Sequence, residues 1–279
     1  MARSLRWWGA VLALGLMAVA CAASEENLAV VANAPGTFAV GEPQRLMVSL
    51  VDPETSDFLA SPEVSAMAVL TAPDESEVEV PTDFLWTVPD IVGIYVINTT
   101  FDQDGTWWVQ LRPEGYGPTP PAAFTVSTTD PVPGVGDPAP VVTTRTLADH
   151  SIDELSSDDD PNPAFYQLSL DEALASGKPT VVVFATPAFC VSQTCGPMLD
   201  QVKAEAANHP EANFVHVEIY ENLDAASTAD LVIDPAVYAW GLPSEPWVFV
   251  VDSQGVVTAR FEGAMLPGEL GEALAAVGA

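Results

Sequence analysis

Two cysteines five positions apart are the side chains of this sequence best suited to do chemistry. Cys190 and Cys195 follow an apolar, β-branched run from Thr180 to Ala185 and a proline-containing turn, and Gly196-Pro197 then opens a helical pattern. Two thiols at this spacing can close into a disulfide or exchange with thiols of other molecules, and a helix start favours the reactive thiolate. The pattern therefore predicts a redox site between a strand and a helix.

The spacing of the two cysteines sets a condition on the backbone between them. In a continuous helix, residues five apart have Cα atoms about 8 to 9 Å from each other, beyond the roughly 7 Å limit for a disulfide. If the cysteines pair, the residues from Val191 to Thr194 must form a turn outside the helix. Pro197 suits the first helical position, which puts Cys195 near the N-cap and favours a lowered pKa for its thiol.

The N-terminus predicts export. Arg3 and Arg6 precede an apolar run from Trp7 to Ala20, and Ala18-Val19-Ala20 stands directly before Cys21. Residues 1–20 are typical of a signal peptide, and the run is shorter than the roughly 20 apolar residues of a membrane span. Residues 18–21 resemble a bacterial lipobox, which implies lipidation of Cys21, a lipid-anchored tether at 21–28 and attachment to the membrane on its extracytoplasmic side. Ordinary cleavage and free secretion is the alternative.

The cysteine count agrees with lipidation. The sequence has three cysteines, so lipidating Cys21 leaves Cys190 and Cys195 as a couple.

Residues 29–129 are predicted to form an antiparallel β-sandwich. Five β-rich runs alternate with turn signals, at 44–51, 64–70, 93–97, 106–111 and 122–127. Gly93-Ile-Tyr95 and Asp104-Gly-Thr-Trp107 resemble the closing hairpin of immunoglobulin-like domains of bacterial envelope proteins. Trp86, Trp107 and Trp108 are interpreted as core or cross-strand residues, with a binding face as the alternative.

Residues 130–163 are predicted to be a linker, because prolines and glycines dominate residues 130–140 and a polar stretch follows. The triplet Asp158-Asp-Asp160 lacks the ligand alternation, central glycine and closing glutamate of a calcium loop. It is interpreted as a solvated charge run.

Residues 164–279 are predicted to form an α/β domain. Ser169 and Glu172 form a capping box for a short helix, a strand follows at 180–185, a helix at about 197–208 and a strand at 214–220. A short helix at 234–241, strands at 246–251 and 256–261 and a terminal amphipathic helix complete the order. Strands alternating with helices before a hairpin indicate a mixed sheet.

This second domain resembles the thioredoxin superfamily. The matching residues are Phe184-Ala185 through Phe189-Cys190 and the segment from Gly241 through Pro246 to Asp252. The resemblance implies a thioredoxin-like fold, Cys190 and Cys195 as catalytic residues with Cys190 as the attacking one, and a cis-proline at Pro246. It also implies that Pro246, Glu245, Phe189 and Pro187 line the substrate site. The family pattern has two residues between its cysteines, and here four intervene.

The expected function is thiol–disulfide exchange on proteins of the cell envelope, with protein thiols and disulfides as partners and no cofactor. A non-catalytic binding module with a structural Cys190–Cys195 disulfide is the alternative. A third reading is a thioredoxin-like copper protein using both cysteines with Met198 or a histidine; no metal-ligand motif accompanies it. The net charge of −31, from 39 acidic and 8 basic residues, argues against nucleic-acid binding.

Overall fold

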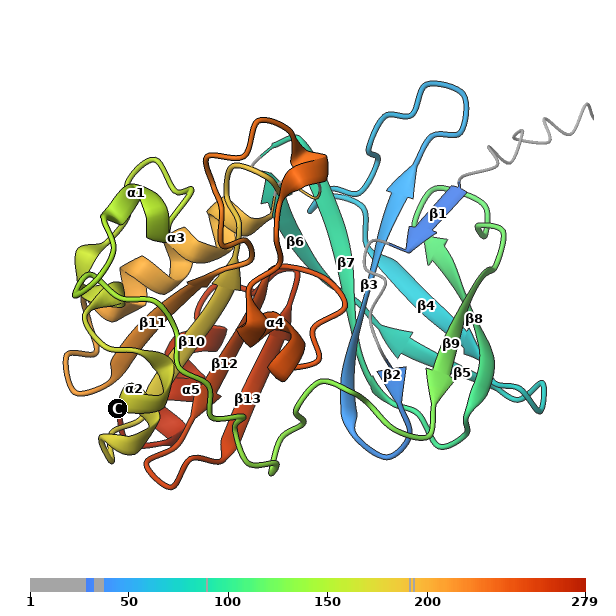
Figure 1. Ribbon diagram of the computed structural model, residues 1–279. Coiled ribbons are helices and arrows are strands. Elements are labelled where there is room, and N and C mark those ends of the chain that lie inside the picture. The colour runs from blue at the N-terminus through green and yellow to red at the C-terminus, as the bar shows by residue number, and fades with distance from the viewer. Residues whose placement is uncertain (1–28, 33–37, 89, 191, 193) are drawn as a thin grey trace, which may run out of the picture.

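The chain folds into two units that lie side by side (Figure 1). The computed structural model describes residues 29–32, 38–88, 90–190, 192 and 194–279. The predicted signal peptide, the tether and Cys21 lie outside the described residues. Two packed β-sheets form the first unit, and a single sheet with helices on both faces forms the second.

The first unit is a β-sandwich, as predicted. One sheet has the strand order β1-β3-β7-β6 and the other β2-β9-β8-β4-β5, and every pairing except β2 with β9 is antiparallel. The strands are β1 (Ala29–Ala32), β2 (Phe38–Ala39), β3 (Pro43–Val51), β4 (Ala66–Thr71), β5 (Glu77–Pro81), β6 (Asp83–Val88), β7 (Val92–Thr100), β8 (Gly105–Pro113) and β9 (Ala122–Ser127). All five predicted runs are strands.

The inward faces of the two sheets share one apolar core. Leu46, Val48 and Leu50 of β3 alternate with outward residues and meet Leu70 and Leu111 of the other sheet. Buried aliphatic side chains of this size each contribute about 1.5–3 kcal/mol relative to an exposed position. The core therefore supplies most of the force that joins the sheets.

The three tryptophans of this unit do not share a face. Trp107 is in the core and donates its indole N–H to the carbonyl of Gln103 at 2.9 Å. Trp108, the next residue along β8, points outward, and Trp86 lies on the other sheet against Phe84. The interpretation of Trp107 as a core residue is confirmed, and a joint binding face of the three rings is not formed.

The second unit has a four-stranded sheet in the order β11-β10-β12-β13. Its strands are β10 (Thr180–Ala185), β11 (Asn213–Glu218), β12 (Trp247–Val251) and β13 (Val257–Glu262). β10 is parallel to β11 and antiparallel to β12, and β12 pairs with β13 as a hairpin. β10 and β12 read as continuous apolar runs because helices bury both of their faces.

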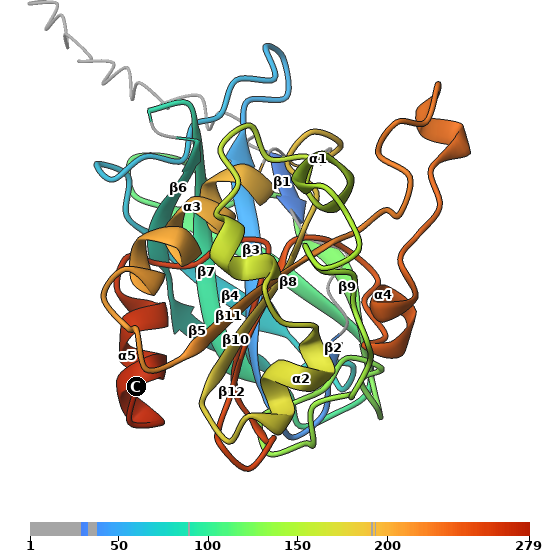
Figure 2. The ribbon, with the colours of Figure 1, turned by 60° about the vertical axis from the view of Figure 1, so that its left-hand side comes forward.

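Helices cover both faces of this sheet (Figure 2). α2 (Leu170–Ala175) and α4 (Pro235–Ala239) lie on the face lined by Val182, Phe184 and Phe249, whereas α3 (Cys195–Ala206) and α5 (Glu269–Ala276) lie on the face lined by Val181 and Val250. The short elements are α1 (Ile152–Leu155), η1 (Pro163–Tyr166) and η2 (Thr228–Asp230). The capping box predicted for α2 is present.

The segment 130–163, predicted as a linker, is packed against the second unit along much of its length. Val132 and Ala139 are buried in the core around Phe184, and Leu155 is buried on the opposite face of the sheet. The amide of Ala139 donates to the carbonyl of Gly255 at 2.9 Å. Its apolar residues are spaced between prolines without a strand or helix period, so the sequence pattern does not reveal that they are buried.

An apolar and ionic interface joins the two units. Met47, Leu85 and Ile94 of the sandwich pack against Ala264. Arg45 pairs with Glu269 at 3.0 Å. Arg260 of β13 pairs at 2.8 Å with Asp130, which follows the last sandwich strand and is almost fully buried. The interface therefore fixes the sandwich against the β13 edge of the sheet and the start of α5.

Candidate functional site

Cys190 and Cys195 form a disulfide at the carboxyl end of β10. Their Cα atoms are 6.0 Å apart, and α3 begins at Cys195, so Cys190 lies before the helix. After β10 the chain turns, with the amide of Phe189 donating to the carbonyl of Thr186 at 3.1 Å. The pairing thus meets the condition set by the spacing. Of the four residues between the cysteines, Val191 and Gln193 lie outside the described residues.

The helix starts two residues earlier than predicted. Pro197 is its third residue and Cys195 its first, with Thr194 as the N-cap. Proline is tolerated there because the amides of the first turn have no partner within the helix. Cys195 therefore belongs to the helix, and its side chain faces the apolar core between α3 and the sheet.

The two sulfur atoms have different surroundings. Cys195 is 0 % exposed and packs with Met198 and Leu199, whereas Cys190 is half-buried. The amide of Cys195 donates to Sγ of Cys190 at 3.3 Å, and the hydroxyl of Ser192 lies 3.2 Å from the same sulfur. A helix-start amide stabilises a thiolate that it contacts, and apolar burial opposes one. The arrangement thus favours a thiolate on Cys190; from the sequence, the helix start pointed to Cys195 and the family resemblance to Cys190.

The other predicted site residues lie at the same end of the sheet. The peptide bond between Glu245 and Pro246 is cis, the geometry that the resemblance implied. Pro246 immediately precedes Trp247, which pairs with Phe184 near the end of β10. Phe189 packs edge-on against Tyr220, with ring centroids 5.9 Å apart, and Pro187 is half-buried in the turn before it. β10 and β12 thus bring these side chains toward the disulfide end of the domain.

Sequence reasoning missed a buried carboxyl group beneath this loop. Glu218, the last residue of β11, is 2 % exposed and lies opposite Ala185 in the sheet. It accepts hydrogen bonds from the amide and hydroxyl of Ser157, at 2.9 and 2.8 Å. The amide of Ala188 donates to the same hydroxyl at 3.2 Å. Ser157 therefore links the buried carboxyl to the loop that carries Cys190, and burial raises the pKa of Glu218.

The signal for Glu218 was present in the strand that contains it. In the run from Phe214 to Tyr220, His216 and Glu218 alternate with Val215 and Val217, as in a half-exposed strand. Both polar residues are buried, because residues 156–166 cover that face. Polar residues that alternate along an edge strand such as β11 indicate a buried network only when the segment that covers them is known.

Asp158 differs from its predicted role as part of a solvated charge run. Its carboxylate is nearly buried and pairs with Lys203 of α3 at 2.8 Å, and the carbonyl of Asp160 accepts from the same ammonium group at 3.2 Å. Asp159 and Asp160 are exposed, as predicted. Ser157 and Asp158 together thus tie the Cys190 loop and α3 to one segment.

His216 is a structural residue whose two ring nitrogens both have partners. Its ring nitrogens lie 3.0 Å from the carbonyl of Ala185 and 2.6 Å from the hydroxyl of Tyr166. Burial lowers the pKa of His216 to about 4, so the ring is neutral at physiological pH. His216 cannot be the histidine of the alternative copper site, because both of its ring nitrogens lie within hydrogen-bond distance of protein groups. The described residues contain no cluster of three or more His, Cys, Asp or Glu side chains arranged to hold a metal.

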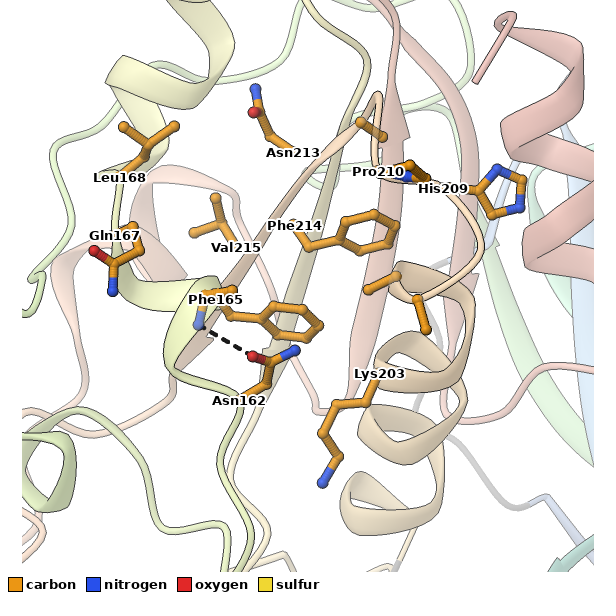
Figure 3. A pocket seen from close by; sticks show the side chains of 14 residues that line it. Asn162, Phe165, Gln167, Leu168, Lys203, His209, Pro210, Asn213, Phe214 and Val215 are labelled. Atoms are coloured by element: carbon orange, nitrogen blue, oxygen red, sulfur yellow. Dashed lines mark hydrogen bonds between the residues drawn. The ribbon is translucent and has the colours of Figure 1, made fainter.

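A separate cavity of about 320 Å³ lies between η1 and the far end of α3 (Figure 3). Phe165 and Phe214 stack across it, with ring centroids 5.7 Å apart. Lys203 and His209 on its border already face carboxylates, and Asn162 accepts from the amide of Ala164. Eight residues of helix, about 12 Å, separate Lys203 from Cys195, so this cavity is not part of the disulfide site.

Comparisons with known proteins add little to this geometry. No protein-family model matches the chain, and no curated protein matches it. Among solved structures, the chain is similar to the filamin domain of Lin-41, with 16 % identity over 38 % of this chain and 96 % of that domain, at a TM-score of 0.26. Within the described part of the chain, no helix has the length and apolar character needed to cross a membrane.

Proposed function

We propose that this protein is a thioredoxin-like thiol–disulfide exchange protein of the cell envelope, with the Cys190–Cys195 disulfide as its reactive group. The observation that carries the proposal is the asymmetry of the pair: Cys190 is a half-buried residue whose sulfur accepts a hydrogen bond from the amide of Cys195, whereas Cys195 is fully buried. Exchange needs one sulfur that a partner can reach and one that can leave and return.

The exchange steps follow from this asymmetry. A substrate thiolate attacks Sγ of Cys190, the Cys190–Cys195 bond breaks, and Cys195 leaves as a thiolate that takes up a proton. A second substrate thiolate then attacks the substrate sulfur of the mixed disulfide and releases Cys190. The substrate dithiol is oxidised to a disulfide and the protein disulfide is reduced to two thiols. The reverse sequence reduces a substrate disulfide.

The N-terminal sequence supports the location. The signal-like run before Cys21 suits export, and a lipid on Cys21 would anchor the protein outside the cytoplasmic membrane. An oxidising compartment also suits a disulfide as the resting state. The sandwich then stands between the anchor and the redox domain.

A second candidate is a non-catalytic binding module with a structural disulfide. The observation that favours it is the complete burial of Cys195 within the core that contains Met198 and Leu199. A disulfide held on one side by a packed core can persist without exchanging.

The two candidates are separated by mixing the oxidised protein, in a Cys21→Ser background, with an excess of a dithiol peptide and measuring loss of peptide thiols. The proposal predicts that one equivalent of peptide is oxidised per protein disulfide. Cys190→Ser abolishes the reaction, and reduced Cys195→Ser stops at a mixed disulfide on Cys190 when given a disulfide peptide. A protein disulfide that stays intact in excess dithiol peptide overturns the proposal.

A further inference from the structure

The sandwich closes one side of the disulfide. Leu85 and Thr87 of β6 are buried and meet Thr194 and Pro197, at the first turn of α3, around a gap of only about 10 Å³. A space of this size holds at most one water molecule. A partner protein therefore has to reach the disulfide from another side.

An apolar surface begins next to Cys190, beside Tyr220. Phe189 packs on Tyr220, which forms an antiparallel bridge with Ile233, and the amide of Glu221 donates to the carbonyl of Val232 at 2.9 Å. Ile233 is 36 % exposed and shares a side of this pair with Tyr220, whereas Val232, 51 % exposed and paired with Glu221, faces the other side. They end the loop between β11 and α4, which stands out from the body of the molecule (Figure 2). Exposed apolar side chains that adjoin a reactive group are typical of a contact surface.

A carboxylate without a partner among the described residues lies at the same end of the sheet, directly before Pro246. Glu245 is half-buried, and no hydrogen bond or ion pair joins it to another described residue. Burial raises its pKa. Burial also raises the pKa of Tyr220, and the nearby charge of Glu245 adds to that effect. A cation that approaches on binding stabilises the charged form of a half-buried carboxylate more than that of a fully exposed one.

Among the described residues, no lysine or arginine side chain pairs with Glu245. Arg45, Arg112, Arg260 and Lys203 each pair with a carboxylate elsewhere. Arg145 lies beside Tyr220, but its guanidinium is occupied by Asp234 at 3.7 Å and by the carbonyls of Tyr220 and Glu221 at 3.0 and 2.8 Å. The other described lysine, Lys178, precedes β10 and so lies at the opposite end of the strand from the disulfide. The complementary charge must come from the binding partner.

We propose that Phe189, Tyr220, Ile233 and Glu245 form a docking surface for an extended segment of a partner protein whose reacting cysteine is flanked by basic and apolar residues. This inference rests on the proposed exchange function. Apolar side chains of the segment lie against Tyr220 and Ile233, and a lysine or arginine faces Glu245. The high negative charge of the whole chain strengthens attraction for the same partners over longer range.

The test uses three dithiol peptides that are identical except for flanking residues: Lys and Leu, Gln and Leu, or Glu and Leu. The second-order rate of oxidation by the oxidised protein is measured for each. It is divided by the rate of the same peptide with hydroxyethyl disulfide, a small neutral reagent. This ratio removes the effect of flanking charges on the reactivity of the peptide thiols themselves.

We expect the Lys peptide to exceed the Glu peptide by about ten-fold or more at low salt, with the preference shrinking at high salt as screening increases. Glu245→Gln should reduce the preference several-fold. Glu77→Gln, which removes an exposed acid on β5 of the sandwich, is the matched control and should retain it. Replacing Leu by Ser in the Lys peptide should slow the reaction.

The outcomes distinguish a failure of the docking proposal from a failure of the exchange function on which it rests. Equal normalised rates for the three peptides, with oxidation still occurring, overturn the docking proposal and leave the exchange function standing. An unchanged preference in Glu245→Gln also overturns it. Failure to oxidise any peptide refutes the exchange function itself. Self-association that is lost in Glu245→Gln, together with equal peptide rates, would assign the surface to a second copy of the chain and contradict the proposal.

Discussion

At Cys190 and Cys195, the environment of each sulfur decides its share in any exchange. Cys195 lies inside the helix-side core, where desolvation opposes a charged thiolate. Cys190 precedes the helix and receives the amide of Cys195 and the hydroxyl of Ser192. These contacts lower the free energy of a thiolate on Cys190, and partial exposure gives it access to partners.

The reduced protein is therefore expected to alkylate asymmetrically. Iodoacetamide should modify Cys190 at least about ten times faster than Cys195, because the attacking species is the accessible thiolate. Peptide mapping by mass spectrometry after short reaction times measures both rates in one sample, in a Cys21→Ser background. Equal rates at the two positions would contradict the assignment of Cys190 as the reacting sulfur.

His216 gives the fold a dependence on pH. In the unfolded chain its imidazole binds a proton near pH 6.5, whereas burial keeps the folded ring neutral down to a pKa of about 4. The unfolded state thus binds more protons in this window, so the contribution of His216 is fully present above pH 6.5 and is lost as pH falls toward 4. Burial raises the pKa of Glu218, so its contribution to stability has the opposite pH dependence and is lost as pH rises.

Comparison with His216→Gln isolates this contribution. Between pH 7 and pH 5 the unmodified protein should lose about 2 kcal/mol more unfolding free energy than the variant, because Gln does not titrate. Urea denaturation at both pH values measures the difference, and Glu218 contributes to both proteins. Parallel losses in the two proteins would show that His216 does not stay neutral in the fold.

Among the elements, α3 and the strands with regular patterns were predictable. β10 reads as an apolar run because both faces are covered, and the capping box of Ser169 and Glu172 marks the start of α2. β5 and β6 were not predicted. β5 is an edge strand of five residues in which two valines alternate with exposed glutamates, so its strand pattern is present but short.

The local sequence predicts where the loop with the two cysteines lies, but it does not predict the contacts that hold this loop in place. Two cysteines at a strand end are visible in the sequence, whereas the contact of Ser157 with Glu218 joins residues far apart along the chain. Neither residue has a distinctive neighbourhood in the sequence. Contacts of this kind depend on how the segment 130–163 crosses the sheet, which no periodicity encodes.

Gly241 shows how closely that segment packs. Its φ is +63°, and a Cβ at this position would collide with the carbonyl oxygen of Pro131. Gly255 also has a positive φ, of +81°, but faces open space. The two positions therefore share backbone strain and differ only in the approach of the segment.

We expect Gly255→Ala to cost about 1 kcal/mol, from the left-handed backbone alone. Gly241→Ala should cost at least about 2 kcal/mol more, because Pro131 or the helix α4 must also move. Chemical denaturation of both variants provides the comparison. Equal losses of unfolding free energy in the two variants would mean that the segment 130–163 moves away at little cost, as an unpacked linker would.

For the whole molecule, the interface between the two units determines how the sandwich sits beside the Cys190–Cys195 disulfide. Arg260 and Asp130 form its most buried ion pair among the described residues, with side-chain exposures of 10 % and 3 %. The guanidinium also donates to the carbonyl of Val132 at 3.2 Å. Removing the arginine leaves the carboxylate of Asp130 buried beside Glu262.

Arg260→Ala should therefore destabilise the protein by about 3 kcal/mol, the range for breaking a buried pair. Arg112→Ala is the matched control: its partner Glu79 and Arg112 itself are largely exposed, so the loss should stay below about 1 kcal/mol. Thermal and urea unfolding of the two variants are compared. Similar small losses would show that the interface contributes little to holding the units together.

The central claim, that the disulfide exchanges with protein thiols, is tested most directly by its equilibrium with glutathione. The oxidised and reduced protein, in a Cys21→Ser background, is quantified across a series of glutathione redox buffers. We predict a reduction potential between about −270 and −120 mV, the range of exchanging dithiols. A potential below about −300 mV, at which the bond resists the glutathione pool, would mark a structural disulfide and contradict the claim.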